Sequence, residues 1–116
     1  MCPALTVRVR THTGTTVLSL DGELDLDTRA GFAEAVDALP PLSGHVVVLD
    51  LSQVAFMDST GINLFLALRA RARAEGGRLE FVGVRRQALQ VMDLTGTRRL
   101  FTVRPSRSPV AYRPSS

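Results

Sequence analysis

The most constraining feature of this sequence is an apolar run that leads, through a short polar segment, into a helical pattern. The run, Val46 to Leu51, contains a single polar residue. Such a strand is typical of the centre of a parallel sheet that is covered on both faces. The residues Ile62 to Leu68 follow a helical period instead. We therefore expect a buried strand over 45–51, a short loop that ends in Asp58–Gly61, and a helix over 59–75.

The rest of the chain divides into further strand and helix patterns. Strands are expected over 5–10 and 15–20, and their short connection favours an antiparallel hairpin. A helix is expected from Arg29 to about Leu39, with Asp27 or Thr28 as its cap. The remaining expected elements are a strand over 78–82, a helix over 85–94 and a last strand over 100–103. The order β-β-α-β-α-β-α-β predicts one α/β domain with a mixed, mostly parallel sheet and an antiparallel strand at its start.

Composition predicts a single domain over 1–103 and a disordered tail over 104–116. A chain of 116 residues suits one domain, and its last 13 residues are rich in Arg, Pro and Ser. The tail holds three of the 14 basic residues and no acidic one, which leaves 11 basic against 11 acidic residues in the domain. Nucleic-acid binding would instead require a basic patch on the domain, so we expect no nucleic-acid partner.

The chain carries no sequence signal for a membrane or a secretory pathway. No uninterrupted apolar stretch approaches the roughly 20 residues that a membrane helix needs, and the N-terminus lacks the pattern of a signal peptide. Cys2 is the only cysteine, so no disulfide can form within the chain. These observations predict a cytoplasmic protein without a membrane partner.

The polar segment Asp58-Ser59-Thr60 has two interpretations. Asp, Ser and Thr are preferred at helix starts because their side-chain oxygens accept hydrogen bonds from first-turn N–H groups. By itself this favours Ser59 as part of a cap without further function. The alternative is phosphorylation of Ser59, since a phosphate there would meet free N–H groups and the positive end of the helix dipole.

Catalysis at this segment is not supported by the sequence. A nucleophilic Ser needs a general base, and the only histidines, His12 and His45, lie in an expected turn and at an expected strand start. A nucleophile elbow needs Gly two residues before the Ser, where this chain has Met57. The chain also has no Lys for a phosphate-binding loop. We therefore expect no catalytic residue, no cofactor and no enzymatic activity.

An acidic stretch follows the second expected strand, because every second residue from Asp21 to Asp27 is acidic. An extended chain would place these carboxylates on one face. A calcium loop starting at Asp21 would need Gly at its sixth position and Glu at its twelfth, but Leu26 and Phe32 stand there. Loop acids and a helix cap are therefore the better interpretation, and no metal site is expected.

The helix after Ser59 has two sets of apolar residues. Ile62, Phe65 and Leu66 form a stripe that we expect to face the sheet. Leu64 and Leu68, which are four residues apart, lie on a different side of the helix from this stripe. They either pack beneath a neighbouring helix or form an exposed apolar strip for a partner.

Together these motifs resemble the bacterial anti-sigma factor antagonists, which belong to the STAS domain family. Val47–Gly61, ending in Phe56-Met57-Asp58-Ser59-Thr60-Gly61, resembles the family signature, and Gly22-Glu23-Leu24-Asp25 matches its other recurring stretch. Gly76-Gly77, Val82-Gly83-Val84 and Met92–Gly96 fit as well. The resemblance covers about residues 5–103.

The resemblance implies a switch that a partner controls. It makes Ser59 the phosphoacceptor of an anti-sigma factor that is also a serine kinase. The unphosphorylated antagonist binds this kinase and frees a sigma factor, phosphorylation breaks the complex, and a serine phosphatase resets it. The implied partner-binding residues are Asp25, Asp58, Ser59, Thr60, Gly61, Asn63 and Leu64. A phosphorylation-independent adaptor subunit of a stress-sensing or lipid-transport assembly is the alternative.

Overall fold

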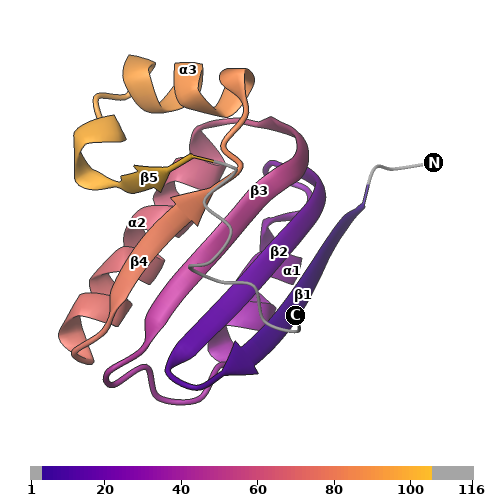
Figure 1. Cartoon of the computed structure of the whole chain (residues 1–116). Coiled ribbons are helices and arrows are strands. Elements are labelled where there is room, and N and C mark those ends of the chain that lie inside the picture. The colour runs from indigo at the N-terminus through magenta and orange to yellow at the C-terminus, as the bar shows by residue number, and fades with distance from the viewer. Residues whose placement is uncertain (1–3, 106–116) are drawn as a thin grey trace.

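A computed structural model describes residues 4–105. Its elements are β1 (Leu5–His12), β2 (Thr15–Leu24), α1 (Arg29–Asp37), β3 (Val46–Met57), α2 (Ser59–Ala74), β4 (Arg78–Val82), α3 (Arg86–Leu94), a 3₁₀ turn (Arg98–Leu100) and β5 (Thr102–Arg104). The five strands form one sheet in the order β1-β2-β3-β4-β5 (Figure 1). β1 is antiparallel to β2, and the other neighbouring strands are parallel. The predicted α/β class and element order are confirmed.

The helices of residues 4–105 lie on one face of the sheet, and β3 is nevertheless buried on both faces, as the apolar run predicts. Figure 1 shows α1 and α2 behind the sheet and α3 beyond the end of β3. Buried residues of all three helices join one core cluster with the strands. On the opposite face, strand residues among those described form a second small cluster of Val17, Val48 and Val82, and each is at most 4% exposed. The helices share one face because right-handed crossovers that all advance in the same direction across a sheet place their helices on the same side.

β2 and β3 both run farther than the sequence predicts. The prediction ended them at Leu20 and Leu51, because the polar residues and glycine that follow are poor strand formers. The two strands stay paired through two register shifts, and Leu24 still lies opposite Met57. As a result β2 and β3 end side by side. The motif Gly22–Asp25 begins within the last residues of β2, and the motif Phe56–Gly61 begins within the last residues of β3.

The core is built around Phe65 of α2. Its ring packs edge-on against Phe32, Phe81 and Phe101, with centroid separations of 5.9, 5.2 and 6.4 Å. The other buried aliphatic residues of α2 are Ile62, Leu68 and Ala72, whereas Leu66 is half-buried. The predicted sheet-facing stripe is therefore correct for Ile62 and Phe65, and Leu68 takes the place expected for Leu66.

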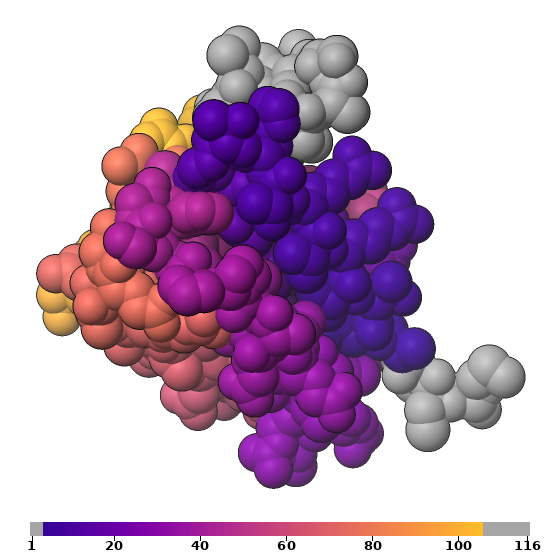
Figure 2. Space-filling view, turned by 90° about the horizontal axis from the view of Figure 1, so that it is seen from below, coloured from indigo at the N-terminus to yellow at the C-terminus, as the bar shows by residue number. Residues whose placement is uncertain are grey.

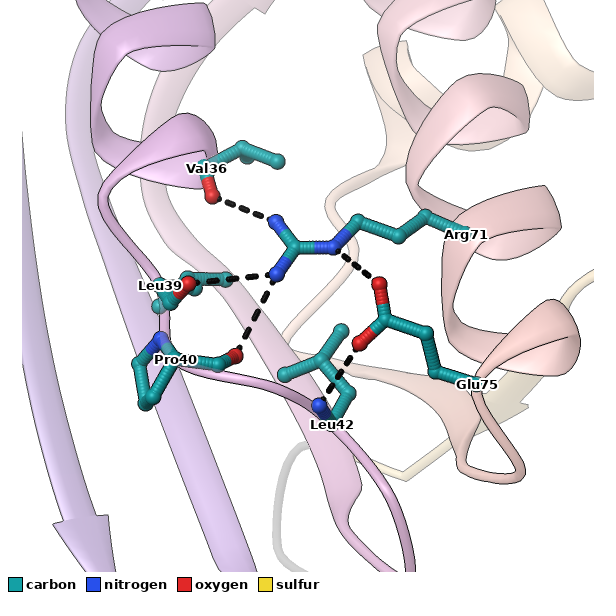
Figure 3. A network of polar contacts seen from close by, with 6 residues as sticks. All are labelled: Val36, Leu39, Pro40, Leu42, Arg71 and Glu75. Carbon is teal, nitrogen blue, oxygen red and sulfur yellow. Dashed lines mark hydrogen bonds and ion pairs between the residues drawn. The ribbon is translucent and has the colours of Figure 1, made fainter.

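Arg71 of α2 ties this helix to the end of α1 (Figure 3). Its guanidinium donates to the carbonyl oxygens of Val36 and Leu39 at 2.7 and 3.1 Å, at the end of α1. Its Nε donates to Glu75 Oε2 at 2.8 Å, and Glu75 Oε1 accepts the backbone N–H of Leu42 at 2.8 Å. The hydrogen bonds from Leu42 and Arg71 lower the pKa of Glu75. This network fixes α1 against α2.

The pole of the molecule opposite the ends of β2 and β3 is closed by connecting segments (Figure 2). The Gly44 N–H donates to the Gly76 carbonyl at 3.3 Å, and the Arg78 N–H donates to the His45 carbonyl at 3.1 Å. A Cβ added to Gly77 would lie 2.6 Å from the His45 carbonyl oxygen. This pole holds the segments together and contains none of the predicted site residues.

β5 includes Arg104, which the sequence assigned to the tail. Arg104 Nε donates to Glu80 Oε1 at 2.6 Å, and Arg78 Nε donates to Glu80 Oε2 at 2.9 Å. The hydrogen bond from Arg104, more than that from Arg78, lowers the pKa of the largely buried Glu80 below its usual value. Residues 106–116, which make up most of the predicted disordered tail, lie outside the described residues.

Candidate functional site

The carboxyl ends of β2 and β3 bring the two predicted motifs to one rim of the sheet. Leu24 pairs with Met57, and the backbone N–H of Asp58 donates to the Leu24 carbonyl at 3.3 Å. One residue beyond these points, β2 enters the turn at Asp25 and β3 enters the N-terminus of α2. The carboxyl edge of a parallel sheet is where ligands and partners usually bind. The rim is therefore the candidate site.

Asp58, and not Ser59, caps α2. Its backbone is extended, and its Oδ1 accepts the N–H of Thr60 at 2.8 Å. The N–H of Gly61 donates to the Asp58 carbonyl at 3.0 Å. Ser59 is the first helical residue, and its exposed hydroxyl makes no hydrogen bond to any residue of 4–105. The interpretation of Ser59 as a cap is wrong, and its hydroxyl is left accessible.

Gly61 allows the first turn of α2 to pack on the strand ends. It is buried, and an added Cβ would lie 3.0 Å from Leu24 Cδ2 and 3.3 Å from Met57 Cε. These contacts are closer than most Cβ contacts in proteins. The packing at Gly61 therefore holds Ser59 and Thr60 at a defined height above the sheet.

The Asp25 carboxylate organises the turn between β2 and α1. Its Oδ1 accepts the N–H groups of Asp27 and Thr28 at 3.0 and 3.2 Å. Thr28 occupies the N-cap position of α1 but makes no side-chain cap bond, because its Oγ1 donates to the Glu23 carbonyl at 2.8 Å. Asp25 thus shapes the backbone of this part of the rim.

The described residues offer no metal site and no membrane span. Within 4–105, no three His, Cys, Asp or Glu side chains are placed to hold a metal ion together. The acidic stretch is divided between β2, which carries Asp21 and Glu23, and the turn that follows. Among the helices of the same residues, none is long and apolar enough to cross a membrane.

The rim also presents large apolar side chains whose exposure no sequence signal indicates. Phe56, opposite Glu23 in the sheet, is 42% exposed, and Leu26, in the turn after Asp25, is 62% exposed. On α2, Asn63 is exposed and Leu64 is half-buried. Large apolar side chains that are exposed beside a polar site are typical of a protein-binding surface. The exposure of Phe56 depends on the irregular register of β3 opposite Gly22 and Glu23, so it is evident only once β3 is known to reach Met57.

Gln87 of α3 is a positioning residue that no sequence signal indicates. Its Oε1 accepts the Met57 N–H at 2.9 Å, and its Nε2 donates to the Met57 carbonyl at 2.8 Å. The paired register of β3 with β4 ends at Asp50 and Val82. The amide of Gln87 therefore takes the place of a neighbouring strand at Met57, two residues before Ser59.

Replacing Gln87 by Ala is expected to lower the free energy of unfolding by roughly 1–3 kcal/mol, because it leaves two polar groups of the buried Met57 without partners. Gln87→Glu keeps the acceptor and loses the donor, so its loss of stability should lie between zero and that of Gln87→Ala. Gln90→Ala, at an exposed position of the same helix, is the control. Urea denaturation measures all three, and equal stability of Gln87→Ala and Gln90→Ala would contradict the role assigned to Gln87.

Known proteins resemble this chain in sequence and in fold. A family model described as "Mlab, STAS domain" matches residues 7–103. The anti-sigma-F factor antagonist RsfB of Mycobacterium tuberculosis is 34% identical over 101 residues, which cover 85% of this chain and 83% of RsfB. The crystal structure of an anti-sigma factor antagonist from Mycobacterium paratuberculosis has a TM-score of 0.78 at 27% identity, and covers 97% of this chain and 95% of that one.

A more distant likeness supports the fold alone. The structure of the Bacillus cell fate determinant SpoIIAA in its phosphorylated form has a TM-score of 0.65 at 21% identity, with 93% of this chain and 97% of that chain covered. RsfB and the Mycobacterium paratuberculosis protein are named as antagonists of regulatory factors, in agreement with the expectation that the chain is not an enzyme. Because the family model spans 7–103 and RsfB is 34% identical over most of the chain, this protein belongs to the STAS domain family.

Proposed function

We propose that this protein is an anti-sigma factor antagonist that is switched by phosphorylation on Ser59. In the unphosphorylated form it binds an anti-sigma factor, which is also the serine kinase, and so releases a sigma factor. Phosphorylation of Ser59 ends the complex, and a serine phosphatase restores the active form. The names of the two mycobacterial relatives support the antagonist role, and a solved relative, SpoIIAA, is described in a phosphorylated form.

The accessible hydroxyl of Ser59 is the observation that carries the proposal. Asp58 accepts the first-turn N–H of Thr60, so the hydroxyl of Ser59 is not needed for capping. A phosphate on Ser59 would meet the remaining N–H groups and the positive end of the helix dipole, worth about 0.3–1 kcal/mol at an exposed position. The Asp58 carboxylate opposes it by like charge. Attraction to the helix N-terminus and repulsion by Asp58 offset each other, so phosphorylation changes the stability of the chain little. Its main effect is on the binding of a partner.

The other predicted contact residues lie either near Ser59 on α2 or at the end of β2, which is paired with β3. Thr60 and Gly61 continue the first turn of α2, Asn63 lies exposed on the next turn, and Asp25 shapes the facing end of β2. We assign Asp25, Thr60 and Asn63 to the surface that the anti-sigma factor covers, and the buried Gly61 to the packing that holds this surface in place. A doubly charged phosphate within such a surface would be desolvated by the partner, and this is the source of the switch.

Intact-mass measurement tests the proposal. The protein is mixed with the anti-sigma factor encoded beside its gene and with ATP, and we expect the mass of one phosphate to be added. Ser59→Ala should remove the transfer, whereas Ser43→Ala, the control at an exposed serine of the opposite pole, should retain it. Tight binding without any transfer would instead favour the phosphorylation-independent adaptor, and transfer to another residue would overturn the assignment of Ser59.

A further inference from the structure

A groove between α1 and α2 opens on the surface below the candidate site. It has a volume of about 210 Å³ and is mostly apolar. Its walls are Ala33 and Val36 from α1 and Leu64 and Ala67 from α2, over the buried Phe32 and Leu68. Leu68 is thus packed beneath the neighbouring helix, while Leu64 remains half-buried at the edge of the groove.

The groove continues the surface around Ser59. Leu64 belongs both to its wall and to the predicted partner-binding residues. At a rise of 1.5 Å per residue, the groove runs along α2 from roughly 8 Å beyond Ser59, at Leu64, to roughly 18 Å, at Arg71. A stable interface involves roughly 20–30 residues on each side, far more than the rim motifs supply. An anti-sigma factor centred on Ser59 must therefore cover further surface, and the groove is the adjoining apolar part.

The charges at the groove select the chemistry of its occupant. Asp37 of α1 and Arg71 of α2 both line it. The guanidinium of Arg71 is committed to Glu75 and to carbonyl oxygens at the end of α1. Asp37 is exposed and forms no ion pair with any residue of 4–105. The charge that remains available beside the apolar walls is therefore negative.

We propose that this groove receives an aliphatic side chain of the anti-sigma factor, from a helix that also presents a basic residue to Asp37. The inference rests on the proposed function and names a second contact for the same partner. Amphipathic helices commonly place apolar side chains in grooves of this kind. An anchor side chain that fills a desolvated pocket of an interface commonly carries a large share of the binding free energy.

Ala67→Glu tests the inference, because Ala67 is exposed in the groove and Glu is a good helix former. We expect its affinity for the anti-sigma factor that phosphorylates Ser59 to fall at least tenfold, which is about 1.4 kcal/mol. Ala70→Glu, an equal change at an exposed position of α2 outside the groove, should bind within twofold of the parent protein. Titration calorimetry gives the affinities, and the thermal midpoint of each variant verifies its folding.

Charge reversal at Asp37 provides an independent measurement. Asp37→Lys should also weaken binding at least tenfold, and Glu34→Lys, exposed on α1 outside the groove, should not. Parent-like binding by Ala67→Glu, or equal weakening by Ala67→Glu and Ala70→Glu, would overturn the inference while phosphate transfer to Ser59 still upheld the proposed function. A parent protein that neither binds the anti-sigma factor nor accepts phosphate would overturn both.

Discussion

Phosphorylation of Ser59 is expected to weaken binding to the anti-sigma factor about a hundredfold, and Ser59→Asp about tenfold, with the fold intact. A hundredfold loss corresponds to about 2.7 kcal/mol. One phosphate brings about −1.5 to −2 charges and three strong acceptor oxygens, and the partner must desolvate them on a surface that already holds Asp58. A carboxylate brings a single charge on a shorter side chain, so its effect is smaller.

The capping geometry makes the companion variant informative. Because Asp58 accepts the Thr60 N–H and Ser59 makes no described side-chain hydrogen bond, Ser59→Ala should change the free energy of unfolding by less than about 0.5 kcal/mol. It should bind as tightly as the unmodified parent and remain bound in the presence of ATP. Asp58→Ala, the matched change one residue earlier, removes the cap and should cost about 0.5–2 kcal/mol.

Titration calorimetry at two salt concentrations measures this effect. The difference between the parent and Ser59→Asp should shrink as salt rises, because exposed charges are screened within about 10 Å at 0.1 M ionic strength. If the phosphorylated protein binds as tightly as the unmodified one, charge at Ser59 is not the switch. If Ser59→Ala unfolds readily, the cap has been assigned to the wrong residue.

The order of the elements could be predicted from the sequence because it depends on local patterns. The helical period after Gly61 and the Gly76-Gly77 stop define α2, and the alternation over 78–82 defines β4. Each signal lies within a few residues of the element that it predicts. The same reasoning placed the acidic stretch and the Asp58–Gly61 segment after expected strands.

What the sequence could not predict depends on contacts between distant segments. β2 continues through Gly22 because β3 pairs with it across two register shifts, and no local propensity favours a strand there. The placement of the three helices on the same face follows from the strand order, which the sequence leaves open. The clamp of Gln87 on Met57 joins residues 30 positions apart. The choice of Asp58 over Ser59 as cap depends on the extended backbone of one residue.

Gly22→Ala is expected to have the largest effect on stability among single substitutions at the two motifs. Gly22 has a φ of +128°, which side-chain-bearing residues rarely adopt, and an added Cβ would overlap the carbonyl oxygen of Ala4 and lie 3.3 Å from Leu5 Cα. Both neighbours are backbone atoms at the start of β1, so no side-chain rotation relieves the overlap. We expect a loss of about 3 kcal/mol or more in the free energy of unfolding.

Gly14→Ala is the matched control, because Gly14 has a φ of +79° and its added Cβ would meet nothing within 4 Å. It carries the backbone strain without the overlap, and should cost about 1–2 kcal/mol. Gly22 stands at the register shift before Glu23. A displacement there moves Leu24, whose carbonyl accepts the Asp58 N–H, so Gly22→Ala should also weaken partner binding while Gly14→Ala should not.

Urea denaturation and amide hydrogen exchange at Asp58 distinguish these effects. The Asp58 amide should exchange faster in Gly22→Ala than in Gly14→Ala, because its acceptor at the end of β2 is displaced. Equal destabilisation by the two variants would mean that the backbone at Ala4 shifts to relieve the overlap. Gly22 would then be required only for its positive φ. Unequal destabilisation with unchanged exchange at Asp58 would confine the role of Gly22 to the hairpin. Faster exchange together with weaker binding would connect Gly22 to Ser59 through Leu24 and Asp58.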